Sequence, residues 1–410
     1  MQSINSNSKL SKLTLLALAL NCGIALSYIL LWYIAAKDDL LWAADFTAFY
    51  TSGAIVRDGL GDQLYNMNTQ ALYQQNILQG LRYGSNVLLY INPPYAALPF
   101  VPLTLLSLQG AYILWSILQV LLLIAAVAML VRLTKHWHPH ERWLLVSTCL
   151  ALPGVLRSFL LGAFSIFMLV CLLGWVASLK RGNNLSVASW LLLGTFKPQI
   201  IIGPSLICLI GRQWKIITYF ITGGSALFII PIIMFGWEIW LGFIKLLSAS
   251  GSFYDAYGIN PASMYNLRGT LTLWLGNGQA DLINLASFTG FLFGLLLTVW
   301  LWRGKWDPHQ PVFNLRLSFT LLYSTLFSLH VYMQDGVLLA IPGFLLFEYL
   351  LQRDLPRRSL AIFAACCPSI FLLDEFYLSA WLPIRLAVVA MMIILVWSGI
   401  LLRRENLRSK

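Results

Sequence analysis

Charged residues are scarce in this sequence. Only 10% of its 410 residues are Asp, Glu, Lys or Arg, whereas 59% are hydrophobic. Soluble globular domains carry about 25% charged residues. The shortage of charge therefore excludes a soluble globular protein.

Several chemical signatures are also missing. The six cysteines lie within apolar stretches and show neither Cys-x-x-Cys nor Cys/His spacing, so we interpret them as small core residues and predict no metal. Neither Gly-x-x-x-x-Gly-Lys-Ser/Thr nor Gly-x-Gly-x-x-Gly occurs, which leaves no motif for cradling a nucleotide. No internal repeat stands out. We therefore expect neither a metal nor an organic cofactor.

Long apolar stretches are what the chain has in abundance. A bilayer core of about 30 Å needs about 20 apolar residues per helix, and candidates include residues 13–36, 109–133, 216–235, 282–302 and 381–402. The pattern predicts an all-α polytopic membrane protein, a single domain over residues 1–410 with about twelve transmembrane helices. The bilayer is thus its first partner.

The net charge of +11 is explained by topology. If the chain begins in the cytoplasm, the Lys and Arg clusters near residues 132–142, 180–181, 212–215, 303–316, 353–358 and 403–410 all fall on the inner side. Basic loops face the cytoplasm in membrane proteins. The sequence therefore predicts an inner-membrane protein with both ends inside, and no nucleic-acid partner.

Two long loops fall on the outer side, residues 37–108 and 237–281. In the first, Phe46, Phe49, Tyr50, Gly53, Ala54 and Arg57 recur with helical spacing, as one face of a helix. This pattern predicts a short amphipathic helix lying on the membrane, and residues 68–81 predict a second.

The stretch 186–210 is interrupted by Lys197-Pro198, and proline ends a helix. Two short helices meeting near the outer face would keep both flanking basic loops inside. One long kinked helix with a snorkelling lysine is the alternative.

Asp45 is the main candidate for acid–base chemistry, because it stands directly after the first span and before the predicted surface helix. Its structural alternative is a helix N-cap. Asp38 and Asp39 could ligate a cation or act as a base, although such a pair at a membrane boundary is usually just solvated.

Four cations are predicted near the same side. Lys197 could hold a lipid phosphate as a point charge, and His330 could bind phosphate or shuttle a proton, with Asp335 orienting it or capping the next helix. Arg157 and Arg268 lie at other outer turns. One acid among several cations suggests a cavity for an anionic, lipid-linked substrate.

The order of several short motifs resembles the family 87 glycosyltransferases, membrane enzymes of the C-type glycosyltransferase fold. These motifs are Asp45-Phe-x-x-Phe-Tyr50-x-Ser-Gly-Ala, Gly61-x-x-Leu-Tyr65, Tyr90-x-Asn92-Pro-Pro94 with Leu98-Pro99, Leu161-Gly162-Ala-Phe-Ser165, Gly194-x-x-Lys197-Pro198, Ser263-x-x-Asn-Leu-x-Gly269 and His330-x-Tyr332. The family often has Gly-Gln-x-Asn where this chain has Gly162-Ala163-Phe164-Ser165, a departure that concerns acceptor recognition.

The resemblance implies transfer of mannose or a related hexose from a polyprenyl-phosphate donor to a glycolipid or glycan acceptor, with inversion, on the extracytoplasmic side. By it, Asp45 would be the general base, and Lys197 and His330 would hold or neutralise the donor phosphate. Tyr50, Asn92 and Tyr332 lie within the shared motifs and are candidate substrate-binding residues. Family members of this kind are metal-independent.

A transporter or lipid flippase is the alternative function. It would also be polytopic with charges at a cavity, but such proteins usually show two related halves. A structural subunit of an envelope complex is a third possibility, and it predicts no dependence on Asp45.

Overall fold

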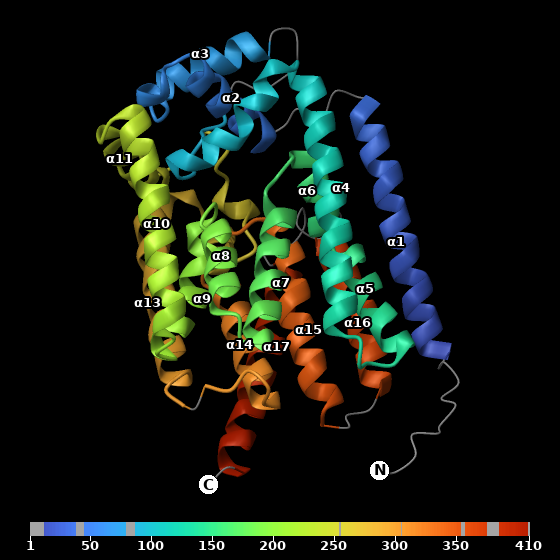
Figure 1. Ribbon diagram of the computed structural model, residues 1–410. Coiled ribbons are helices and arrows are strands. Elements are labelled where there is room, and N and C mark those ends of the chain that lie inside the picture. The colour runs from blue at the N-terminus through green and yellow to red at the C-terminus, as the bar shows by residue number, and fades with distance from the viewer. Residues whose placement is uncertain are drawn as a thin grey trace.

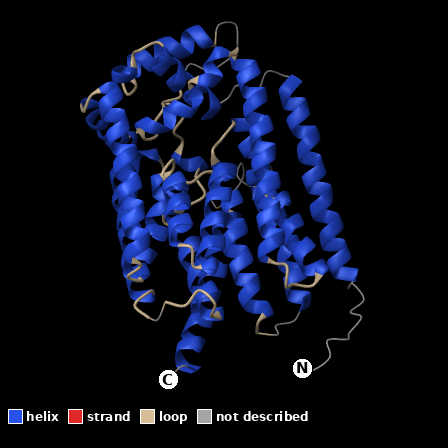
Figure 2. Cartoon of the chain, viewed as in Figure 1, coloured by secondary structure: helices blue, strands red, loops and turns tan. Residues whose placement is uncertain are grey.

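The computed structural model describes residues 12–37, 45–78, 87–253, 256–304, 306–353, 357–374 and 385–408. In these ranges the regular elements are helices, gathered into an upright bundle with a layer of shorter helices across one end (Figures 1 and 2). The all-α expectation is confirmed for this part of the chain.

Long apolar helices form the bundle. Within the described ranges six are long and apolar enough to cross a membrane, and a seventh span arises if α5 and α6, which are bent by 42° at their junction, are counted as one. They are α1 (Lys12–Lys37), α4 (Leu108–Leu133), α10 (Trp214–Phe235), α13 (Ala280–Leu301), η7 (Met333–Leu339) continued by α15 (Ala340–Leu351), α17 (Leu386–Arg408), and the pair α5 (Pro139–Ala151) and α6 (Pro153–Leu161).

The remaining bundle helices are shorter, so the predicted count of twelve spans is not confirmed. They have between 11 and 17 residues, against the roughly 20 that a bilayer crossing needs. They are α7 (Ser165–Arg181), α8 (Asn184–Gly194), α9 (Pro198–Ile210), α14 (Pro311–Leu326) and α16 (Arg357–Leu373).

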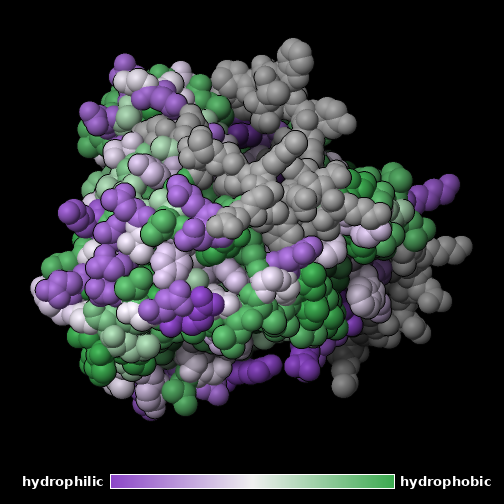
Figure 3. All heavy atoms as spheres, turned by 90° about the horizontal axis from the view of Figure 1, so that it is seen from above, coloured by the Kyte–Doolittle hydropathy of each residue, from purple (hydrophilic) through white to green (hydrophobic). Residues whose placement is uncertain are grey.

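The bundle exposes apolar side chains on its flanks. Ile233 of α10 is 78% exposed and Leu296 of α13 is 68% exposed. Exposed apolar surface on this scale is stable in lipid and not in water. By contrast, the face seen from above in Figure 3 carries hydrophilic side chains among the apolar ones. These features identify a multi-pass membrane protein.

Helices α8 and α9 form a hairpin, with Thr195, Phe196 and Lys197 between them. A side chain added at Gly194 would meet Ile201 of α9, and one added at Gly223 of α10 would meet Leu192 of α8. Helix α8 therefore runs alongside α10, and α9 returns to the end from which α8 started.

The hairpin places Lys197 at its tip. Helix α8 has 11 residues, so it rises roughly 16 Å at 1.5 Å per residue, about half the thickness of a hydrocarbon core. Two short helices were one of the two predicted arrangements, and the structure has this one.

A layer that we call the roof covers one end of the bundle (Figure 1). The start of α1 and the C-terminal end of α17 lie at the opposite end. It consists of α2 (Asp45–Arg57), η2 (Gly61–Gln63), α3 (Met67–Ile77), η3 (Pro94–Phe100), η4 (Pro102–Leu105) and α11 (Glu238–Ser250). The sequence predicted α2 as a helix with one buried face, but its residues from Phe46 to Ile55 are all buried. The reason is that η3 covers the small-residue side of α2, where a side chain at Gly53 would lie 2.8 Å from the backbone of Phe100.

Helix α3 is fixed by two glutamines one turn apart. Gln70 Nε2 donates to Leu64 O at 2.8 Å, and Gln70 Oε1 accepts from Tyr90 N at 2.8 Å. Gln74 makes the same pair of bonds to the backbone of Leu88, at 2.6 and 2.9 Å. The buried face of α3 is thus polar, and it satisfies the backbone of the extended segment that leads into η3.

Smaller elements complete the chain near the loop that carries His330. They are η5 (Pro261–Ser263), α12 (Leu267–Leu275) and η6 (Asn277–Gln279). Tyr265 N donates to Val331 O at 2.9 Å, and Asn260 N donates to the Tyr332 hydroxyl at 3.1 Å. These bonds join the second long loop to the segment that enters η7.

Candidate functional site

A buried ion pair forms the centre of the candidate site. Lys197 Nζ lies 2.5 Å from Asp335 Oδ1, with the lysine side chain 13% and the aspartate side chain 2% exposed. Ser165, at the start of α7, donates to the same Asp335 oxygen at 2.6 Å and accepts from Lys197 Nζ at 3.3 Å. A buried charge needs such a partner, because desolvating it alone is costly.

Asp45 lies beside this pair. Gln334, the residue before Asp335, donates from Nε2 to Asp45 Oδ2 at 3.3 Å. Burial raises the pKa of Asp45 to about 6; the charge of Lys197 and the Gln334 bond lower it, and the charge of Asp335 raises it. A carboxylate with a pKa near the working pH suits a general base.

His330, Tyr332 and Arg268 form the other side of the cluster. The rings of His330 and Tyr332 meet edge to face at 4.8 Å. Burial lowers the pKa of His330 to about 4, the charge of Asp335 opposes that shift, and the charges of Lys197 and Arg268 reinforce it. The predicted convergence of Asp45, Lys197 and His330 is therefore present, with Arg268 close by.

Hydrogen bonds from neighbouring segments hold these side chains in place. Asn266 caps α12 by accepting from Gly269 N at 2.9 Å and donates to Ser328 O at 2.9 Å, which fixes the loop before His330. Tyr95 of η3 donates to Thr195 O at 3.0 Å, two residues before Lys197. The roof and the second long loop thus both anchor the site.

Gly162 sets the turn between α6 and α7. Its φ of +63° lies in the left-handed region, and a Cβ there would lie 2.5 Å from Cβ of Phe46. Glycine is favoured on both grounds. The turn therefore packs directly against Phe46, the residue after Asp45.

Helix ends concentrate at the cluster. Asp45 begins α2, Ser165 begins α7, Lys197 precedes α9, and Asp335 lies in the first turn of η7. Helix N-termini carry partial positive charge that favours anions. Together with Lys197 and Arg268 they could stabilise a phosphate.

The other predicted residues lie further from this centre or at its edge. Arg157 is half-buried on α6, which packs against η7, and Arg268 donates to Gly251 O at 2.8 Å. Tyr50 donates its hydroxyl to Leu106 O at 2.7 Å, and the carbonyl of Asn92 accepts from the Tyr65 hydroxyl at 2.6 Å, so these contacts belong to the roof. Asp38 and Asp39 lie outside the described residues.

Sequence reasoning missed two members of the cluster, Ser165 and Gln334. Ser165 stands at the last position of the motif that departs from the usual family pattern, and that departure was the one signal available for it. Gln334 is an uncharged residue whose neighbour, Asp335, drew attention instead. Its importance follows from a contact 289 residues apart in the chain.

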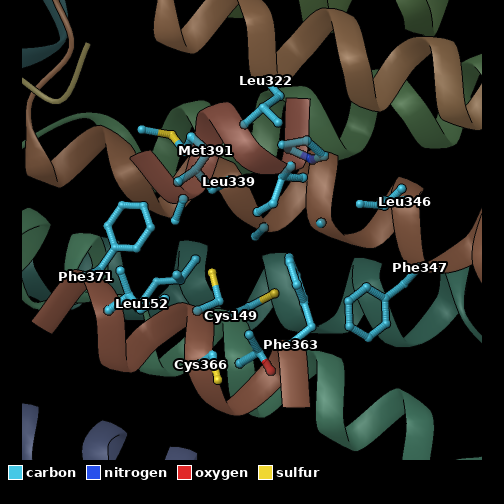
Figure 4. Close-up of a pocket in the computed structure, with 18 of the residues that line it drawn as sticks. Cys149, Leu152, Leu322, Leu339, Leu346, Phe347, Phe363, Cys366, Phe371 and Met391 are labelled. Atoms are coloured by element: carbon cyan, nitrogen blue, oxygen red, sulfur yellow. The ribbon is translucent and has the colours of Figure 1, made fainter. Parts of the chain in front are cut away.

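In addition to a small pocket beside Asp335, the described residues also form an apolar cavity. It has a volume of about 240 Å³ and lies among α5, α14, α15, α16 and α17, with Cys149, Leu152, Leu339 and Phe371 in its wall (Figure 4). Its described lining contains no acidic or basic side chain. Its described lining therefore offers no carboxylate or histidine for acid–base chemistry.

Comparison with known protein families identifies a match. Glycosyltransferase family 87 matches residues 90–329, which is more than half of the chain. No curated protein and no solved structure matches it. The matched range includes Ser165, Lys197 and Arg268. Asp335 lies outside it but bonds to Lys197 and Ser165 within it, whereas Asp45 and its partner Gln334 both lie outside it. The chain therefore belongs to glycosyltransferase family 87.

Proposed function

We propose that this glycosyltransferase moves mannose or a related hexose from a polyprenyl-phosphate donor to an extracytoplasmic glycolipid or glycan acceptor, with inversion at the sugar carbon. One observation carries the proposal. A carboxylate suited to a base, Asp45, shares a buried cluster with Lys197 and Asp335.

In the proposed reaction, the acceptor hydroxyl oxygen attacks the anomeric carbon of the donor while the bond from that carbon to the phosphate oxygen breaks. The electron pair of the broken bond stays on the phosphate, and the hydroxyl proton passes to the Asp45 carboxylate. The polyprenyl phosphate leaves as a monoester, with one negative charge more than it carried in the donor.

The new charge on the phosphate needs stabilisation in a site with little water. Lys197, Arg268 and the starts of α7 and α9 supply positive charge. His330 has a pKa of about 4, so at neutral pH it would hold the phosphate by donating an N–H bond and not as a cation. This assignment differs from a role for His330 in neutralising charge.

The depth of the site supports a lipid-borne donor. Lys197 lies at the tip of the α8–α9 hairpin, about half a bilayer from the end at which α8 starts. A donor anchored in the bilayer could present its phosphate at this level without a soluble carrier domain. Family membership also favours the transferase over the transporter or flippase.

The test is transfer by purified protein in liposomes, with radiolabelled undecaprenyl-phosphate mannose as donor, undecaprenyl-phosphate glucose as a second sugar, and a lipid and glycan extract of bacterial envelope as acceptor. We expect Asp45→Asn to lose a factor of about 10²–10⁴ in rate. Asp62→Asn, an exposed acid of η2, is the matched control and should transfer at the wild-type rate.

Lys197→Ala separates binding from chemistry in the same assay. It should mainly raise the apparent KM for the donor. Transfer by Asp45→Asn within a few-fold of wild type would reject the base assignment, and an unchanged donor KM in Lys197→Ala would reject the phosphate contact.

A further inference from the structure

Two consecutive residues of η7 contact the two charged groups of the proposed reaction. Gln334 donates to Asp45 at 3.3 Å, and Asp335 accepts from Lys197 at 2.5 Å. Asp45 is 289 residues from Gln334, and Lys197 is 138 residues from Asp335. One turn of η7 thus connects parts of the chain that are otherwise remote.

This turn is itself held firmly. Asp335 Oδ2 accepts from Tyr332 N at 3.4 Å, and the Ser158 hydroxyl of α6 lies 3.4 Å from the Gln334 carbonyl. A side chain at Gly154 of α6 would lie 2.4 Å from Val337 N, so the two backbones are in close contact. Both Gln334 and Asp335 are buried.

The two aspartates of the cluster differ in what they can do. The Asp335 carboxylate accepts from Lys197, Ser165 and Tyr332, and it is 2% exposed. Among the described residues, the side-chain hydrogen bond to the Asp45 carboxylate comes from Gln334, and Asp45 is partly exposed. Asp335 is therefore suited to fixing its hydrogen-bond donors in place. Asp45 is suited to exchanging a proton.

We propose that Gln334 and Asp335 are positioning residues, which fix the carboxylate of Asp45 and the ammonium of Lys197 at a set separation. The inference rests on the proposed function, because it takes Asp45 as the base and Lys197 as the phosphate contact. A rigid turn that orients both groups before substrate arrives lowers the reorganisation that the reaction needs.

The contacts predict opposite effects of the two residues on the titration of Asp45. The charged and titratable groups facing it are Lys197 at the hairpin tip, Asp335 of η7 and Tyr332 before η7. Removing the Gln334 bond destabilises the Asp45 carboxylate. Removing the Asp335 charge stabilises it, both directly and because Lys197 is no longer neutralised.

The experiment compares Gln334→Leu with Asp335→Asn. In the liposome assay with undecaprenyl-phosphate mannose, the acid limb of the profile of kcat/KM against pH should move up by about one pH unit in Gln334→Leu, since a hydrogen bond to a charged group has about that effect. It should move down by about one unit in Asp335→Asn. Limbs that do not move, or that move in the same direction, would overturn the proposal even if both variants are slow.

Glu348→Gln is the matched control for losing a buried carboxylate. Glu348 of α15 is buried and accepts from His136 at 2.9 Å and from Trp137 at 2.6 Å, but it lies 13 residues, roughly 20 Å along the helix, from Asp335. This variant should leave the acid limb in place.

Two additions keep the test decisive. If Asp335→Asn does not accumulate in membranes, Gln334→Glu replaces it. Both Gln334 variants should then move the limb up, and Gln334→Glu further than Gln334→Leu because it adds a negative charge; a limb that stays in place in Gln334→Glu would overturn the proposal. Each variant is also melted with and without Asp45→Asn across pH, which reports the titration of Asp45 without any substrate. Full activity of Asp45→Asn would thus refute the proposed function, while the melts would still decide the positioning role.

Discussion

The raised pKa of Asp45 predicts that the proposed base makes the protein less stable. Replacing Asp45 by Asn removes the ionisable group but keeps an oxygen that can accept from Gln334. Burial holds the pKa of Asp45 at about 6, above its ordinary value of 3.8. We therefore expect Asp45→Asn to abolish transfer and to stabilise the fold at alkaline pH.

The sign and size follow from proton linkage. Between pH 3.8 and about 6 the folded state binds more protons than the unfolded state, so the stability due to Asp45 is present below that window and is lost as pH rises through it. A shift of about two units corresponds to about 3 kcal/mol, or about 2 kcal/mol after allowing for the partial exposure of Asp45.

The assay is thermal unfolding in lipid nanodiscs, followed by tryptophan fluorescence at pH 4.5, 6 and 8. Asp45→Asn should melt above wild type at pH 8, and the difference should shrink towards zero at pH 4.5. A variant that is less stable than wild type at all three pH values would refute the reasoning, because it would show that the ionised carboxylate is well solvated or paired in the fold.

Three further predictions concern neighbouring residues. Asp335→Asn leaves Lys197 buried without its partner and should cost about 3–5 kcal/mol in thermal unfolding, and adding Lys197→Met should restore part of this; equal stability of the single and double variants would contradict the ion pair. Gly162→Ala should destabilise the fold by about 1–2 kcal/mol because of its positive φ, and by more because of its contact with Phe46; it should also slow transfer. Gly182, with a φ of +66°, has open space around it, so Gly182→Ala should cost only the about 1–2 kcal/mol that comes from φ. Similar melting temperatures for the two variants would argue against the Phe46 contact. His330→Gln should retain more transfer than His330→Ala, because a neutral imidazole acts through its N–H, and wild-type kcat/KM should show no histidine titration between pH 6 and 8; a limb in that range that His330→Gln removes would contradict the low pKa.

The sequence predicted the membrane class, the α2 helix and the meeting of Asp45, Lys197 and His330, since these depend on local pattern and on scarce charges. It did not predict that α2 is buried on all sides. Thr47, Thr51 and Ser52 look like a solvent-facing side, and only the close approach of η3 at Gly53 shows that another segment covers them.

The predicted number of spans was not confirmed for a different reason. Basic loops on both sides of residues 184–210 require the chain to return to the same side, but they do not say how far it travels first. Helices of 11 and 13 residues are shorter than the roughly 20 residues of a full span, and charge rules cannot distinguish such a hairpin from two full spans. Gln334 escaped notice because neutral residues gain their role only from three-dimensional contacts.

The distance in sequence between Lys197 and Asp335 has a consequence for how the protein is made. During synthesis the hairpin tip emerges 138 residues before the aspartate that pairs with it. A lysine in the centre of a spanning helix costs about 2.5–3.5 kcal/mol on insertion. We therefore expect the nascent hairpin to stay at the lipid headgroups until η7 has been synthesised. Chains truncated between α9 and η7 would then keep a hairpin that is not inserted, and quality-control proteases could degrade them.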